Sequence, residues 1–168
     1  VGPRSSSAYQ HYGGFASYAV APASALMHIP PQLGFAQACN LLGNYETAYH
    51  ALVHCADLKA GDSILINGAT GATGLAAVHL AKIIGATVIV TGRSAEKLSV
   101  VKEQGADFAL ILDQDAQGEY AFKNRVRACL GGRGADVVYD GVGGGVIEHS
   151  LRSLRFGGTY VVVGWAST

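Results

Sequence analysis

Between residues 63 and 164 the chain alternates between short apolar runs and segments with helical periodicity. The apolar runs are continuous, rich in Val and Ile, and bounded by polar residues or glycine. Continuous apolar strands separated by helices are typical of a parallel sheet that helices cover on both faces. The pattern predicts strands at 63–67, 87–91, 108–112, 136–140 and 159–164, and helices at 73–84, 94–104, 120–130 and 146–154.

This succession predicts an α/β fold, a Rossmann-type doubly wound parallel sheet of about five strands. Gly85 and Gly105 follow two helical segments directly, where glycine ends a helix without strain. The doubly wound sheet usually has six strands in the order 3-2-1-4-5-6. In that order the sixth strand is missing here, and Tyr160–Val163 becomes an apolar edge that favours self-association.

Residues 1–34 differ from the remainder. A strand-like run, Phe15–Val20, follows two glycines, and prolines interrupt what comes after it. Residues 35 to 56 have helical periodicity, with Gly43-Asn44 as a point where the segment could divide into two helices. We therefore predict two domains, residues 1–34 as the remnant of a preceding domain and residues 35–168. Because the chain opens with Val1 instead of Met, we expect it to be a segment of a longer protein.

The most informative motif is the glycine loop Gly68–Gly74, which reads G-A-T-G-A-T-G. It lies between an apolar strand and a helix, as a dinucleotide fingerprint requires. Glycines let the backbone approach a pyrophosphate, and the helix behind offers free N–H groups and a partial positive charge. The spacing is G-x-x-G-x-x-G, whereas the usual fingerprint is G-x-G-x-x-G. The loop predicts a dinucleotide site. The alternative is that its glycines serve only to let the helix pack closely on the strand.

The end of the second strand indicates which dinucleotide. An acidic residue about twenty positions after the loop would bind the ribose hydroxyls and select NAD. Here the strand ends Thr91-Gly92-Arg93-Ser94, with no Asp or Glu, and Lys97 follows about one helical turn later. A planar guanidinium suits a phosphate. We predict NADP rather than NAD, with Arg93 as a solvated surface residue as the alternative.

Composition and charge exclude several function classes. The chain has 12 Lys+Arg against 12 Asp+Glu and no basic run, so it lacks the electrostatic footprint of a nucleic-acid or anionic-membrane protein. Three cysteines stand apart without a C-x-x-C motif, which fits free thiols in a reducing compartment and a cytoplasmic location. Glu46, His50 and His54 share a helix face, but no further ligand cluster accompanies them, so no metal site is expected.

Several segments together are similar to one known family. They are Gly13–Tyr18, Thr47–Leu52, Leu58–Asp62, the glycine loop with Leu75-Ala76-Ala77, Val138–Gly144 and Gly157–Gly164. These motifs resemble the medium-chain dehydrogenase/reductase superfamily, and within it the zinc-free quinone oxidoreductase (zeta-crystallin-like) branch. The first of them is similar to the end of that family's GroES-like domain, so the resemblance implies that residues 1–34 are a short remnant of it.

The resemblance implies NADP(H) as cofactor and hydride transfer to a quinone or another α,β-unsaturated carbonyl. It implies that the pyrophosphate and 2′-phosphate are held by Gly71, Ala72, Thr73, Gly74, Arg93, Ser94 and Lys97. It places Thr47, Gly143, Gly164, Trp165 and Ser167 near the nicotinamide. It assigns no catalytic residue within this chain, because the protein mainly orients the cofactor and stabilises developing charge.

Two departures from the family pattern matter. The zinc-dependent branch has a cysteine ligand in the segment that matches Leu41-Leu42-Gly43, and none stands here. Some quinone reductases place a Tyr after the third strand, where this chain reads Ile111-Leu112-Asp113. Two alternatives therefore stay open: an enoyl reductase acting on an acyl thioester, and a cofactor-binding fragment with no turnover of its own. The expected partners are a small-molecule substrate and further copies of the chain in a homo-oligomer such as a dimer.

Overall fold

The computed structural model describes residues 16–113 and 122–166. Its contacts divide the chain into two units, residues 1–43 and 44–168. In the first unit a 3-10 helix, η2 (Ala23–Ala25), precedes α1 (Phe35–Tyr49), which runs on into the second. The helix continues through Gly43-Asn44, so a division there is wrong; one helical glycine costs only about 1 kcal/mol. The boundary between residues 34 and 35 stays a prediction.

The strand-like run near the N-terminus does not form a strand. Residues 16–20 are irregular, and Tyr18 and Val20 are exposed. A strand needs a neighbour for its backbone hydrogen bonds, and none of the described residues pairs with this segment. The apolar pattern alone was therefore misleading here.

The second unit contains the predicted alternation of strands and helices. A π-helix, η3 (His50–Cys55), extends α1 before the sheet begins. The elements that follow are β1 (Ser63–Asn67), α2 (Ala72–Ile84), β2 (Thr87–Gly92), α3 (Ala95–Glu103), β3 (Phe108–Ile111), α4 (Lys123–Cys129), β4 (Ala135–Asp140), α5 (Val146–Ser153) and β5 (Leu154–Val162). The first residues of the predicted helix at 120–130, residues 120 and 121, lie outside the described residues.

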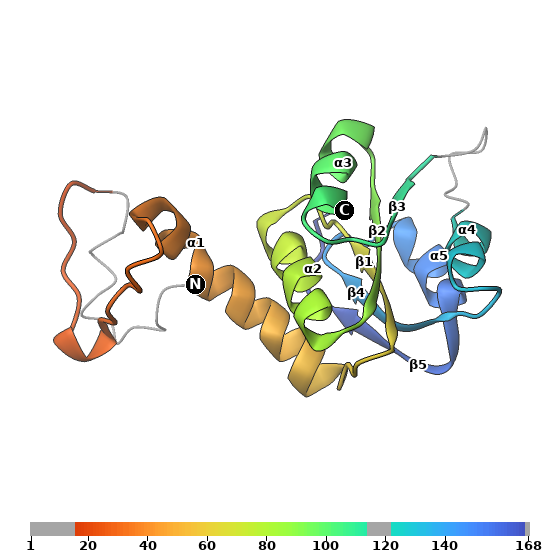
Figure 1. Cartoon of the computed structure of the whole chain (residues 1–168), viewed down its shortest axis with the longest axis horizontal. Helices are drawn as coiled ribbons and strands as arrows, with labels where there is room; N and C mark the ends of the chain where they lie inside the picture. The colour runs from red at the N-terminus through yellow and green to blue at the C-terminus, as the bar shows by residue number, and fades with distance from the viewer. Residues whose placement is uncertain (1–15, 114–121, 167–168) are drawn as a thin grey trace. The chain divides into compact units, whose positions relative to one another are not determined.

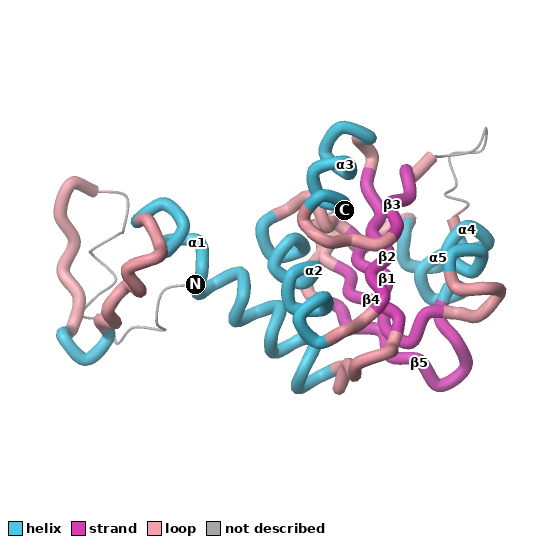
Figure 2. The backbone as a smooth tube through the Cα atoms, in the orientation of Figure 1, coloured by secondary structure: helices cyan, strands magenta, loops and turns pink. Residues whose placement is uncertain are grey.

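The strands form one parallel sheet in the order β3-β2-β1-β4-β5 (Figures 1 and 2). This order matches the doubly wound sheet predicted from the sequence, with five strands described. The chain winds outward from β1 to β3 and then returns to build β4 on the other side of β1. The carboxyl ends of β1 and β4 therefore flank the switch point, where doubly wound sheets bind their ligands.

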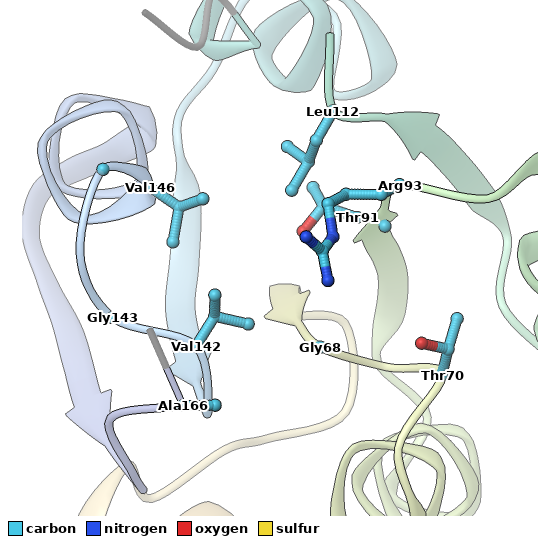
Figure 3. A pocket seen from close by; sticks show the side chains of 11 residues that line it. Gly68, Thr70, Thr91, Arg93, Leu112, Val142, Gly143, Val146 and Ala166 are labelled. Atoms are coloured by element: carbon cyan, nitrogen blue, oxygen red, sulfur yellow. The ribbon is translucent and has the colours of Figure 1, made fainter. Parts of the chain in front are cut away.

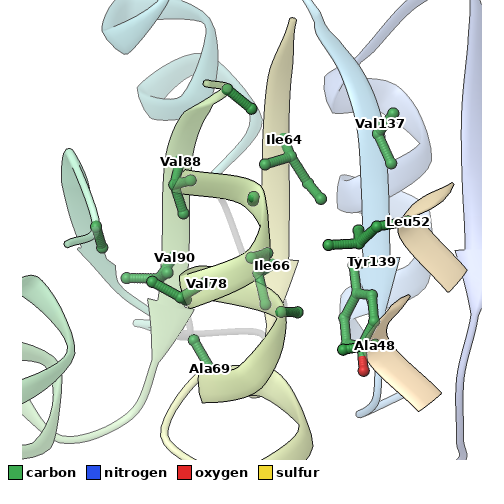
Figure 4. Close-up of a cluster of buried hydrophobic side chains, with 14 of the residues drawn as sticks. Ala48, Leu52, Ile64, Ile66, Ala69, Val78, Val88, Val90, Val137 and Tyr139 are labelled. Carbon is green, nitrogen blue, oxygen red and sulfur yellow. The ribbon is translucent and has the colours of Figure 1, made fainter. Parts of the chain in front are cut away.

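Alternate residues of the central strands pack into two separate cores. Ile64, Ile66, Val88 and Val90 face α2 and α3, together with Ala48 and Leu52 from α1 and η3 (Figure 4). Leu65, Ile89 and Val138 point to the opposite face, against α4 and α5. Every residue of β1 is buried, because helices cover both faces of the sheet. No helix of the described residues has the length and apolarity that crossing a membrane requires.

Several boundaries follow the predicted signals, and β5 departs from them. The backbone at Gly85 adopts φ 96° and ends α2, and the hydroxyl oxygen of Ser94 caps α3 by accepting from the N–H of Lys97. The fifth strand begins at Leu154 instead of 159, because Leu154 already pairs with Ala135. A register shift then separates this pair from the Val137–Thr159 pair. Such an irregularity in strand pairing has no signature in hydrophobic periodicity.

Helix α2 packs directly onto the end of β1 at Gly74. A Cβ atom on Gly74 would lie 2.3 Å from the carbonyl oxygen of Gly68 and 2.8 Å from the Cα of Ala69. Both are backbone atoms, which have no rotamer that would relieve the overlap. At this position glycine is required by close approach and not by its φ angle.

We expect Gly74→Ala to lower the free energy of unfolding by about 2 kcal/mol or more, because the helix must move off the strand. The matched control is Gly71→Ala, whose Cβ would lie 3.4 Å from the same oxygen at an ordinary φ of −87°. This control should change stability by less than about 1 kcal/mol. Urea unfolding of both variants tests the difference, and equal effects would contradict the packing argument.

Candidate dinucleotide site

The glycine loop joins β1 to α2 in a tight turn. Gly68 adopts φ +75°, and the N–H of Gly71 donates to its carbonyl oxygen at 3.0 Å. No side chain caps the N-terminus of α2, whose first N–H groups have no acceptor within the helix. Gly71 and Ala72 are exposed there, whereas Gly74 is buried against the strand. The loop therefore presents uncapped helix amides of the kind that bind a phosphate.

Thr73 has a structural contact in addition to its place in the loop. Its hydroxyl donates to the side-chain oxygen of Asn44 at 3.1 Å, and its carbonyl oxygen accepts from the hydroxyl of Tyr139 at 3.5 Å. These contacts tie the first turn of α2 to α1 and β4. The side chain of Thr73 is thus engaged with the protein, and its backbone N–H is the group available to a ligand.

A cavity of about 290 Å³ opens beside the loop at the carboxyl ends of β1, β2 and β4 (Figure 3). This is the switch point of the sheet. The described residues that line it come from the glycine loop, the end of β2, the residue after β3, the β4–α5 loop and the segment after β5. They are Gly68, Thr70, Thr91, Gly92, Arg93, Leu112, Val142, Gly143, Gly145, Val146 and Ala166.

Arg93 is the one charged residue among these described lining residues. Figure 3 shows its guanidinium pointing into the cavity toward Gly68. No Asp or Glu is among the described residues that line the cavity, so an anion entering from the loop side meets the positive charge of Arg93. Ser94 and Lys97 follow at the start of α3 and do not line the cavity; the Ser94 hydroxyl oxygen is occupied as the helix cap.

The β4–α5 loop brings two predicted residues together. Gly143 adopts φ +73° and is buried, and a Cβ on it would lie 2.5 Å from Cε3 of Trp165. The indole therefore contacts the Gly143 backbone closely, next to the cavity that Gly143 and Ala166 line. Gly164 follows the end of β5, where its N–H donates to the carbonyl oxygen of Asp140 at 3.4 Å.

Two residues predicted near the nicotinamide do not meet this group in the structure. Thr47 lies on the exposed side of α1 and is not among the residues that line the cavity. Ser167 lies outside the described residues. Their assignment to the site stays a prediction from the family resemblance.

A fully buried chain of polar groups supports the floor of the cavity. The hydroxyl of Thr91 donates to the side-chain oxygen of Asn67 at 2.7 Å, and the Asn67 amide donates to the hydroxyl oxygen of Ser150 at 2.8 Å. All three residues are 0% exposed. The chain crosses from β2 through β1 to α5 and fixes Thr91, a lining residue, relative to both neighbours. Satisfied buried networks of this kind favour one arrangement of the elements that carry them.

Asp140 forms a second buried polar group at the end of β4. Its carboxylate accepts from the N–H of Val142 at 2.9 Å, from the N–H of Gly143 at 3.2 Å and from the hydroxyl of Tyr160 at 2.6 Å. Burial raises the pKa of Tyr160, the hydrogen bond and negative charge of Asp140 raise it further, and a hydrogen bond with Ser150 opposes them. Burial alone raises the pKa of Tyr139 to about 12. Both phenols therefore stay protonated near neutral pH.

Of the predicted site residues that the structure describes, only Arg93 and Gly143 line the cavity. The glycine loop contributes Gly68 and Thr70, whereas Gly71, Ala72, Thr73 and Gly74 are not among the lining residues. The sequence did not predict most of the cavity wall. It also missed the polar groups beneath the wall, namely Asn67, Thr91, Asp140, Ser150 and Tyr160. Three of these are the polar residues that end the apolar runs of β1, β2 and β4. That position was a usable signal, because the carboxyl ends of parallel strands meet at the ligand-binding edge.

The described residues do not fit a metal ion. Within 16–113 and 122–166 no group of three or more His, Cys, Asp and Glu side chains is placed to hold one. The His50 and His54 rings lie with their centroids 5.5 Å apart, without a third ligand. Zinc-free chemistry for the whole protein stays a prediction from the sequence.

The contact between Gly143 and Trp165 predicts a spectroscopic effect. Trp165 is the only tryptophan in the sequence, so intrinsic tryptophan fluorescence comes from this one side chain, which contacts Gly143 and is 64% exposed. We expect Gly143→Ala to change the emission and its quenching by acrylamide, because the new methyl group displaces the indole. Gly141→Ala is the control, since its Cβ would meet only the carbonyl oxygen of Asn67 at 3.9 Å. Unchanged emission in the Gly143 variant would contradict the predicted displacement.

We compared the chain with known protein families, curated proteins and solved structures. A family model described as zinc-binding dehydrogenase matches residues 72–168. The quinone oxidoreductase-like protein 2 homolog of Nematostella vectensis is 39% identical over 156 residues, which cover 92% of this chain and 41% of that protein.

Solved structures resemble the chain over similar lengths. The mycobacterial protein Rv1454c complexed with NADPH has a TM-score of 0.78 and 37% identity, covering 88% of this chain and 44% of that one. The CurK enoyl reductase has a TM-score of 0.74 and 28% identity, covering 84% and 41%. The chain thus spans less than half the length of these three proteins. The chain belongs to the family whose model is described as zinc-binding dehydrogenase, within the medium-chain dehydrogenase/reductase superfamily that the sequence motifs predicted.

Proposed function

We propose that this chain forms the NADP-binding part of an NADPH-dependent oxidoreductase that transfers hydride to a quinone or an α,β-unsaturated carbonyl. The observation that carries the proposal is Arg93, which points into a cavity at the switch point of the sheet and has no carboxylate beside it among the lining residues that the structure describes. A carboxylate at this place would favour NAD, and an arginine accommodates the 2′-phosphate of NADP. The resemblance to a mycobacterial protein complexed with NADPH supports the same cofactor.

Each part of the site has a role in this proposal. The uncapped amides at the start of α2, from Ala72 onward, hold the pyrophosphate. Arg93 binds the 2′-phosphate. The family resemblance adds Ser94 and Lys97, which follow Arg93 at the start of α3 outside the lining of the cavity. Gly143 and Trp165 border the nicotinamide end. The bound cofactor supplies the hydride, and the residues of this chain bind it, orient it and exclude water from it.

Binding of the two reduced dinucleotides tests the cofactor assignment. We expect calorimetric titration to give at least ~10-fold tighter binding of NADPH than of NADH, a difference of about 1.4 kcal/mol. Arg93→Ala should remove this preference by weakening NADPH binding while leaving NADH binding nearly unchanged. Arg133→Ala is the control, because Arg133 is an exposed arginine that does not line the cavity. Equal affinities in the wild-type chain would show that Arg93 is a surface residue and that the NADP assignment is wrong.

A second candidate substrate class is an enoyl thioester, which the likeness to the CurK enoyl reductase favours. A steady-state assay that follows loss of NADPH absorbance, with a simple quinone or an enoyl thioester as acceptor, separates the two. We expect turnover above a protein-free blank with the quinone, and faster than with the thioester. Tight NADPH binding without turnover of either acceptor would instead support a cofactor-binding module whose substrate-facing part lies elsewhere in the protein.

The predicted homo-oligomer, cytoplasmic location and zinc-free chemistry extend this proposal to the whole protein. The homo-oligomer is predicted from the apolar edge of β5, because a strand edge presents unpaired backbone groups. The cytoplasmic location is predicted from the scattered cysteines, and Cys39, Cys55 and Cys129 are free thiols in the structure. Each stays a prediction.

A further inference from the structure

The β4–α5 loop, residues 141–145, supplies one wall of the cavity through Val142, Gly143 and Gly145. Its backbone follows neither a helix nor a strand, and Gly143 and Gly144 both adopt positive φ angles, of 73° and 60°. Glycine makes such a conformation accessible without making it rigid, because glycine also has the most conformational freedom to lose. Something other than regular secondary structure therefore has to fix this wall.

The Asp140 carboxylate makes the contacts that fix it. The N–H groups of Val142 and Gly143 both donate to its Oδ1 atom, at 2.9 and 3.2 Å. Asp140 is 1% exposed and pairs with Val162 of β5, and its carbonyl oxygen accepts from the N–H of Val163, just beyond the strand, at 2.8 Å. The acceptor is thus anchored in the sheet, and the loop is attached to it.

Tyr160 orients this carboxylate from the neighbouring strand. Its hydroxyl donates to the Oδ2 atom of Asp140 at 2.6 Å. The Val142 N–H donates to Oδ1, and the Gly143 N–H is shared between Oδ1 and Oδ2, at 3.2 and 3.3 Å. Rotation of the carboxylate would break contacts on both sides, so the hydroxyl and the loop amides hold one another in place through Asp140. No described lining residue of the cavity is Asp140 or Tyr160, so neither is placed to touch a ligand there.

The position of the loop has a direct consequence for Trp165. The indole packs on Gly143 so closely that a methyl group would not fit between them. A displaced loop would therefore move both the cavity wall and the aromatic side chain at its rim. The same contact makes Trp165 an optical reporter of the loop in the absence of any ligand.

We propose that Asp140 is a positioning residue for the dinucleotide, and that Tyr160 acts on the cavity wall through it. This inference rests on the proposed function, because it concerns the same cavity. It assigns cofactor affinity to a buried carboxylate, Asp140, and a half-buried hydroxyl, Tyr160, neither of which lines the cavity.

The experiment compares Tyr160→Phe, Asp140→Asn and the double variant with Tyr45→Phe as the matched control. Tyr45 also donates or accepts one 2.6 Å hydrogen bond through its hydroxyl, with His79, at a site away from the loop. The readouts are Trp165 emission without ligand, NADPH affinity by calorimetry, and urea unfolding. Asp140→Asn keeps the shape of the side chain and retains one oxygen acceptor for the loop, so folding is expected to survive.

We expect Tyr160→Phe to shift the Trp165 emission and to weaken NADPH binding by roughly 5-fold or more, since a hydrogen bond to a charged group is lost. Tyr45→Phe should leave the Trp165 emission and the NADPH affinity unchanged, even if it lowers the free energy of unfolding as much as Tyr160→Phe does. In the Asp140→Asn background, Tyr160→Phe should add less than about 2-fold, because interacting residues are non-additive.

Three results would overturn the inference: equal effects of the two tyrosine variants on affinity, full additivity of the double variant, or weakened binding with unchanged Trp165 emission. A wild-type chain that binds neither NADPH nor NADH would overturn the proposed function and this inference together. Normal wild-type binding with unaltered affinity in Tyr160→Phe and Asp140→Asn would overturn the positioning role alone.

Discussion

Helix α2 begins so close to the end of β1 that no side chain fits between them. The space where a Cβ of Gly74 would lie is taken by the backbone of Gly68 and Ala69. Because of this contact, the first amides of α2 stand at the edge of the sheet, beside the switch point between β1 and β4. The cavity, the uncapped helix terminus and the reach of Arg93 toward Gly68 all depend on that placement. A bulkier residue at position 74 would move the positive end of the helix away from the cavity.

The sheet can support this site because it is buried on both sides. Alternate residues of β1, β2 and β4 enter two cores, one under α2 and α3 and the other under α4 and α5. The central strands are thereby fixed in position, and their carboxyl ends become a rigid edge from which the loops extend. Precise placement of a ligand needs such an edge, since the loops themselves are rich in glycine.

Buried polar groups then set the positions of those loops. Thr91, Asn67 and Ser150 connect three elements beneath the cavity, and Asp140 holds the wall that faces them. Each group would be costly to bury without a partner, and each has one. The structure thus has two separate sets of groups at this place: the loop backbone and Arg93 line the cavity, and buried or half-buried side chains behind the wall contact that backbone.

The sequence by itself determined the fold class and the order of elements, and it predicted the glycine loop that lies beside the cavity. These features are local, because apolar runs, helical periodicity and a glycine loop between strand and helix are written in consecutive residues. The early start of β5, the continuity of α1 through Gly43 and the absence of a strand at residues 16–20 were not predictable in this way. They depend on whether a distant segment pairs or packs with the residue concerned. For the same reason only the tertiary structure decided that Trp165 lies on Gly143 and that Tyr160 orients Asp140, since these contacts join residues separated along the chain by about twenty positions.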